Sequence, residues 1–247
     1  MPRLTFWNDQ VRVYDDVLPR EAFEALLSHA TYDDYAIVHR EQWHKSWRLG
    51  DGLPLYGTTT YYRPNASLYA PEEHPRYPTQ TPLDAFIDVL KVIVAEAADL
   101  VGEPGASWTG ITVGPWVYPL GSALSLHRNA GAHSGSYTYF IHRQWNFHWG
   151  GQLLVLDSRT GRGDDPDRSP LYPHWLSEQD ENRAGMEPGL ATCVLARPNR
   201  LVFVAPTAYQ MITRVDTNAG NHPRVSLAGF FLRPNEEVRG DAADAVE

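Results

Sequence analysis

Cysteine is almost absent from this 247-residue chain, in which Cys193 is the only one. A single cysteine excludes a disulfide framework and a zinc site built on cysteine pairs. Long apolar runs are also missing. No stretch approaches the roughly 18 residues that a membrane-spanning helix needs, and the start, MPRLTFWNDQVRVYDD, lacks the apolar core of a signal peptide. We therefore expect a cytoplasmic protein with no membrane partner.

Positive charge is scarce as well. The chain has 21 Lys and Arg residues against 30 Asp and Glu, which gives a formal net charge of −9 at pH 7. Without a basic surface, nothing would offset the repulsion between this chain and a phosphate backbone, so nucleic acid is excluded as a partner. The length suits one large domain with a sizeable core, and we predict a single domain over residues 1–247.

The pattern of the chain changes from helices to strands near residue 107. Before that point we expect a strand in VRVYDD, a helix in REAFEALLSHA, a strand in TTTYYRP and a longer helix over 83–102. After it come eight β-rich segments separated by Gly, Pro, Asn or Asp. This order predicts a mainly β fold with supporting α structure, built as a double-sheet roll or barrel. Residues 1–106 would support a core over 107–233, with a loop insertion at 158–189 and an acidic tail at 234–247.

The order of motifs in the β-rich half resembles that of a known family. A strand leads to HRN at 127–129, an aromatic strand then ends near Trp145, and WGGQLLVLD, PNRLVFVAP, YQMITRV and HPRVSLAGFFL follow. This order resembles the prolyl-4-hydroxylase-like branch of the Fe(II)/2-oxoglutarate-dependent oxygenases. The resemblance implies a double-stranded β-helix core (jelly-roll or cupin-like) flanked by N-terminal helices. It also implies Fe(II) and 2-oxoglutarate as cofactors.

The metal site of that family consists of two histidines and one carboxylate, with open positions for 2-oxoglutarate and oxygen. His127 matches the first histidine, Asn129 stands in the place of the aspartate, and Gln210 stands in the place of the distal histidine. The resemblance thus implies these three as the metal-binding and catalytic positions. It also implies that Arg224 pairs with the far carboxylate of 2-oxoglutarate and that Ser226 supplies the hydroxyl beside it.

The two amides alter the chemistry expected of the metal site. A carboxylate brings a full negative charge to a divalent cation, whereas an amide brings only a dipole, so we expect weak iron binding. Tyr209 lies one residue away from Gln210 and is an alternative at that position. Three nearby histidines could replace a lost ligand or could be core and rim side chains bonded to backbone, and these are His133, His142 and His148.

The segment HREQWHKSW, 39–47, is a weaker candidate for a site. Its histidines are five residues apart, a spacing that suits neither one helix face nor one strand face, so they are not expected to share a metal. Its tryptophans, Trp43 and Trp47, lie among polar residues and are candidates for a pocket lid. Trp145 and Trp149 belong to the strand signature and are expected to pack in the core.

Two functions follow from these observations. The first, which the motif order favours, is an oxygenase that oxidises a small molecule or a carrier-bound amino acid in specialised metabolism, by hydroxylation, desaturation or ring closure. The second is a barrel that no longer uses iron and acts as a non-redox enzyme or a ligand-binding partner protein. There His127 would serve as an acid or base and Arg224 as an anion anchor. Halogenation is disfavoured because Asn129 is not a small residue.

Overall fold

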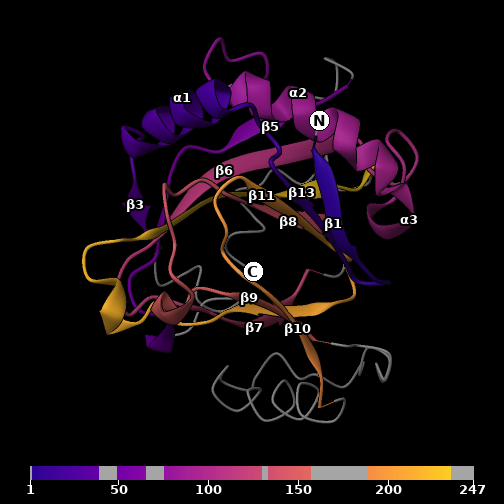
Figure 1. Cartoon of the computed structure of the whole chain (residues 1–247). Coiled ribbons are helices and arrows are strands. Elements are labelled where there is room, and N and C mark those ends of the chain that lie inside the picture. The colour runs from indigo at the N-terminus through magenta and orange to yellow at the C-terminus, as the bar shows by residue number, and fades with distance from the viewer. Residues whose placement is uncertain (1, 39–48, 65–74, 130–132, 157–188, 235–247) are drawn as a thin grey trace.

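Two antiparallel sheets lie face to face, and the helices cover the outer face of the larger sheet (Figure 1). The computed structural model describes residues 2–38, 49–64, 75–129, 133–156 and 189–234. This arrangement confirms the expected fold class, a double-stranded β-helix core with flanking helices. None of the helices in the described ranges is long and apolar enough to cross a membrane.

The larger sheet has nine strands and the smaller sheet four. The strands of the larger sheet follow the order β1 (Arg3–Trp7), β2 (Val11–Asp15), β11 (Arg200–Val204), β8 (His133–Phe140), β13 (Arg224–Leu232), β6 (Gly110–Tyr118), β4 (Leu55–Tyr56) and β3 (Ala36–Ile37). The ninth strand, β5 (Thr60–Tyr62), also pairs with β6. The smaller sheet has the order β10 (Ala191–Val194), β9 (Leu153–Leu156), β12 (Tyr209–Ile212) and β7 (Leu124–Arg128). The helices are α1 (Arg20–Thr31), α2 (Leu83–Glu96) and α3 (Ala98–Val101), and short 3-10 turns are η2 (Leu49–Asp51), η4 (Phe147–Trp149) and η5 (Thr217–Ala219).

Each of the eight predicted β-rich segments contains one observed strand, whereas β1, β3, β4 and the break in the long helix were not predicted. The helix expected over 83–102 is interrupted at Ala97, whose backbone (φ −109°, ψ 18°) leaves the helical region. Its N–H bonds to the carbonyl of Val94, three residues back, which tightens the turn and ends α2. The strand β1 was not predicted, and it extends the larger sheet by pairing with β2.

Successive side chains of β8 point to opposite faces of the larger sheet. Tyr137 and Tyr139 pack against Phe86 of α2, with ring centroids 6.0 and 4.6 Å away. Ser136 belongs to the other face and contacts Asn129, which follows β7 of the smaller sheet. One face of β8 therefore completes the apolar core under the helices, and the other lines the space between the sheets.

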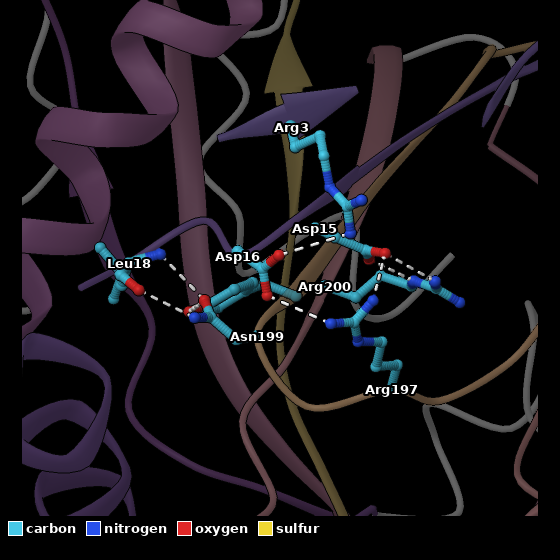
Figure 2. A network of polar contacts seen from close by, with 8 residues as sticks. Arg3, Asp15, Asp16, Leu18, Arg197, Asn199 and Arg200 are labelled. Carbon is cyan, nitrogen blue, oxygen red and sulfur yellow. Dashed lines mark hydrogen bonds and ion pairs between the residues drawn. The ribbon is translucent and has the colours of Figure 1, made fainter. Parts of the chain in front are cut away.

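Asp15, at the end of β2, joins the N-terminal strands to the barrel through two arginines (Figure 2). Arg200 of β11 donates from Nε to Oδ1 at 2.7 Å and from Nη2 to Oδ2 at 2.9 Å, and Arg197 donates to Oδ2 at 2.7 Å. Asp15 is only 2% exposed. Burial by itself would raise the pKa of Asp15, but the hydrogen bonds and charges of Arg200 and Arg197 outweigh it and lower the pKa.

Asn199 fixes the chain that leads from β2 into α1 (Figure 2). It adopts a positive φ of 61°, which asparagine tolerates better than most residues. Its amide bonds both backbone groups of Leu18, at 2.9 Å to the N–H and 2.8 Å to the carbonyl, and its oxygen also accepts from the Tyr139 hydroxyl at 2.6 Å. The start of α1 is thereby held against β8 and β11.

We predict that Asp15→Asn destabilises the protein by about 3 kcal/mol at pH 7, because it leaves two arginines without their buried counter-charge. Urea unfolding of the purified chain measures this loss. Glu24→Gln is the matched control: it breaks the exposed Arg20–Glu24 pair and is expected to change stability by less than about 0.5 kcal/mol. Equal effects of the two substitutions would contradict a structural role for the buried pair.

The same contact predicts a pH dependence. Because the folded-state pKa of Asp15 is lowered, its contribution to stability is complete above the unfolded-state pKa of about 3.9 and is lost as the pH falls through the folded-state value. The difference in unfolding free energy between the wild type and Asp15→Asn should therefore shrink as the pH falls from about 5 to about 2, the range in which the carboxyl group becomes protonated. Unfolding curves across that range test it, and a constant difference would contradict it.

Candidate functional site

Strands β7 and β12 place His127 directly opposite Gln210 in an antiparallel pair. Both side chains are buried, at 8% and 7% exposure. Opposed residues of such a pair share one face of the sheet. The neighbouring pair, Arg128 and Tyr209, belongs to the other face, where the Arg128 guanidinium lies 5.6 Å from the centre of the Tyr209 ring. Gln210 and not Tyr209 is therefore the partner of His127.

The amides of Asn129 and Gln210 converge on one hydroxyl. Asn129 donates from Nδ2 to Ser136 Oγ at 3.2 Å, and Gln210 donates from Nε2 to the same oxygen at 3.3 Å. A hydroxyl oxygen has two lone pairs and can accept both bonds. Because Ser136 belongs to the larger sheet, this contact bridges the two sheets. The structure thus brings the predicted positions together around a serine that the sequence did not single out.

The backbone of β7 sets the tautomer of His127. Its Nδ1 lies 2.8 Å from the carbonyl oxygen of Ser125, which can only accept, so Nδ1 carries the proton. In the neutral ring Nε2 then carries the lone pair. Ser125 is held in turn by the buried carboxylate of Asp51, which accepts from its hydroxyl at 2.8 Å and its N–H at 3.1 Å. Sequence reasoning missed Asp51, because it lies 74 residues from Ser125 along the chain.

Arg224 is completely buried at the start of β13. Its Nε donates to the carbonyl of Gly151 at 2.9 Å and its Nη1 to Ser226 Oγ at 3.1 Å. The guanidinium lies between the rings of Tyr118 and Phe140, 4.9 and 4.8 Å from their centres. Burial lowers the pKa of Arg224 to about 10, so the group is still charged at neutral pH.

One nitrogen of this guanidinium, Nη2, is buried and has no hydrogen-bond partner among the described residues. A buried cation without an anion is strongly unfavourable, and a carboxylate is the group that best matches the guanidinium fork. The geometry therefore fits a carboxylate ligand at Arg224, such as one end of 2-oxoglutarate.

Two consecutive glycines in WGGQLLVLD make this arrangement possible. Gly150 and Gly151 adopt φ values of 71° and 68°, which favour glycine. A Cβ on Gly150 would lie 1.9 Å from the carbonyl oxygen of Arg214, and one on Gly151 would lie 3.0 Å from Arg224 Cδ. The glycines let the chain pass close to the arginine, so that the Gly151 carbonyl can accept from Arg224 Nε.

His142 has a structural role. Its Nε2 lies 2.6 Å from the carbonyl oxygen of Ala196 and its Nδ1 lies 3.2 Å from that of Val225. Burial lowers the pKa of His142 to about 4, so the ring is neutral at physiological pH. Both nitrogens face backbone carbonyls, and neither is directed at the amide cluster, which consists of Asn129 and Gln210 around Ser136. This is the core position that the sequence offered as an alternative to metal binding.

The other candidate side chains also lie away from the amide cluster. The His133 ring stacks on Phe230 at 4.2 Å, and the exposed His148 lies in η4. Trp145 and Trp149 pack edge to face, with centroids 5.4 Å apart. Four candidates lie outside the described residues, namely His39, Trp43, His44 and Trp47.

Solved structures with a similar arrangement include prolyl hydroxylases. A Pseudomonas putida prolyl-4-hydroxylase matches at a TM-score of 0.59 and 13% identity, covering 91% of this chain and 93% of that one. A prolyl hydroxylase from Trichoplax adhaerens, in complex with a hypoxia inducible factor peptide, matches at 0.56 and 10%, covering 93% and 86%. A non-heme α-ketoglutarate-dependent epimerase from nogalamycin biosynthesis matches at 0.50 and 13%, covering 90% and 76%.

The chain has the fold of the prolyl-4-hydroxylase-like 2-oxoglutarate oxygenases. No family model and no curated protein matches its sequence. At identities of 10–13%, the likeness establishes the oxygenase fold and leaves the chemistry to be argued from the residues.

The residues that the resemblance implies as metal ligands do not fit Fe(II). His127, Asn129 and Gln210 offer one imidazole and two neutral amides, and both amide nitrogens already donate to Ser136. Across the described ranges, no group of three or more His, Cys, Asp or Glu side chains is placed to hold a metal ion. The carboxylate of Asp51 is engaged by Ser125. Iron prefers several imidazole and charged oxygen ligands, and these three residues offer a single imidazole and no charged oxygen.

We predict that the double variant Asn129→Asp with Gln210→His binds Fe(II) at least about tenfold more tightly than the wild type, because it adds a negative charge and an imidazole to the slot. Anaerobic titration with Fe(II) measures the gain. Removing His127 from the double variant (His127→Ala) is expected to abolish it. No gain in the double variant would show that Asn129 and Gln210 do not occupy the metal slot.

Proposed function

We propose that the barrel binds a small carboxylic acid at Arg224, either 2-oxoglutarate or a substrate acid of similar length, and does so without iron. The observation that carries this proposal is the fully buried guanidinium whose Nη2 has no partner among the described residues. The chain would then act as a non-redox enzyme or as a ligand-binding partner protein on an oxygenase fold. Its substrate is a small molecule or a carrier-bound amino acid.

The surroundings of Arg224 support a ligand role over a purely structural one. An isolated buried charge costs several kcal/mol, and each ring contact offsets about 2 kcal/mol of that cost without supplying a counter-charge. The hydrogen bonds to Gly151 and Ser226 fix the plane of the guanidinium, and Nη2 is the nitrogen that has no hydrogen-bond partner among the described residues. An incoming carboxylate would supply both the missing counter-charge and the missing acceptor.

His127 is the residue of this site best suited to move a proton. With Nδ1 held by the Ser125 carbonyl, Nε2 is the atom that can take up or deliver a proton toward a bound substrate. Asp51 fixes Ser125 and so acts on His127 only through the backbone. We assign His127 the role of acid or base and Asp51 that of a positioning residue.

Oxidation of the same class of substrate is the second candidate function. The oxygenase fold favours it, together with the His127 tautomer, which leaves Nε2 as the nitrogen that could bind a metal. The products would be those of hydroxylation, desaturation or ring closure, as in a biosynthetic pathway. In either case we propose a reducing, cytoplasmic setting, since the only cysteine, Cys193, is exposed and free.

We predict that Arg224→Gln weakens binding of 2-oxoglutarate or glutarate by at least about 30-fold, since a charge-assisted bidentate contact is lost. Arg224→Lys should recover only part of the affinity, because it restores the charge without the fork. Calorimetric titration in the presence of a chelator measures both, and circular dichroism checks that each variant is folded. The exposed Arg20→Gln is the control. Unchanged affinity in a folded Arg224→Gln would overturn the carboxylate site.

A further inference from the structure

The amides of Asn129 and Gln210 present a set of acceptors where the fold places a metal. Each uses its nitrogen to donate to Ser136 Oγ, and neither has another hydrogen bond within the described residues. Each carboxamide nitrogen has two N–H bonds and gives one to Ser136, so one N–H and the carbonyl oxygen of each amide are left for a ligand. The two oxygens can only accept, so a ligand group that takes both of them must be a donor, and one with several N–H bonds suits them best.

The charge of this acceptor set decides between a metal ion and an organic cation. A divalent cation is held most strongly when charged ligands replace its water, and these residues supply none. An ammonium group carries a single charge and three N–H donors, which neutral amide oxygens satisfy well. His127 lies directly opposite Gln210 and borders the same slot. A donor group with a single charge therefore suits the two oxygens better than a divalent metal ion does.

The carboxylate site lies further along the same strand. Ser136 and Phe140 share one face of β8, four residues apart, which corresponds to about 13 Å between their backbones. Ser136 anchors the amides, whereas Phe140 lies against the Arg224 guanidinium. Side chains from both ends reach into the interval, so a ligand of a few carbon atoms would span it.

We propose that the former metal slot binds an ammonium group, and that the barrel takes a zwitterionic amino acid with its carboxylate on Arg224 and its ammonium on Asn129 and Gln210. This inference rests on the proposed carboxylate site and adds the chemical class of the ligand. It assigns the two amides a recognition role in place of the metal ligation implied by the fold.

Three five-carbon acids test the proposal on the full-length wild-type chain, titrated calorimetrically in chelator. δ-Aminovalerate carries both charges, valerate lacks the ammonium, and glutarate replaces it with a second carboxylate. We expect δ-aminovalerate to bind at least about tenfold more tightly than valerate, since charged hydrogen bonds to two acceptors are gained. β-Alanine, γ-aminobutyrate and ε-aminocaproate, each compared with its unaminated acid, extend the test to other lengths.

Variants locate the effect. Gln210→Met and Asn129→Leu keep the side-chain size and remove the acceptor, so each should abolish the advantage of the amino acid over valerate when both acids are titrated against the same variant. Gln80→Met, at an exposed position outside the barrel, should change the affinity for neither acid. Loss of valerate binding together with the advantage would assign these amides a structural role and overturn the proposal.

The outcomes separate this inference from the proposed function. If valerate and glutarate bind and lose affinity in Arg224→Gln, but no amino acid of the series binds more tightly than its unaminated acid, the carboxylate site stands and the ammonium site is overturned. If no acid binds, or if Arg224→Gln binds them all as well as the wild type does, both are overturned.

Discussion

A full positive charge buried between two sheets is the constraint around which this barrel is organised. The Arg224 guanidinium is sandwiched by the rings of Tyr118 and Phe140 and is bonded on two of its nitrogens. Gly150 and Gly151 have the backbone angles and the close approach that this packing requires. Two glycines and two aromatic residues that lie far apart in the sequence thus surround one side chain, Arg224.

At the other end of the barrel lie the three positions that the resemblance implies as metal ligands, and none of them carries a negative charge. His127 and Gln210 still face each other across β7 and β12, and Asn129 still lies beside them. Both amides donate one N–H to Ser136, and neither brings a charge into the interior. Under the functions proposed above, this end of the barrel would bind a ligand without a metal ion, while Arg224 would bind an acid.

The sequence predicted most of the fold because β structure leaves a local signal. Apolar and β-branched runs broken by Gly and Pro located all eight strands of the second half. Motif order assigned His127 and Gln210 to one site, and β7 and β12 pair these two residues in the structure. Ser136 and Asp51 could not be found this way. Each acts through a contact between segments far apart in sequence, and neither residue type in its local setting differs from an ordinary polar side chain. The break at Ala97 was missed because alanine is itself a strong helix former.

The distribution of buried carboxylates sharpens the contrast between the two functions considered. Among the described residues, two are buried, Asp15 and Asp51. Asp15 is paired with Arg197 and Arg200 at the outer end of the larger sheet, and Asp51 holds Ser125. The hydrogen bonds that Arg224 makes within the described residues go to Gly151 and Ser226, and neither partner is a carboxylate. Under the proposed function the carboxylate of a ligand would supply the counter-charge. Iron binding would instead require changes at Asn129 and Gln210.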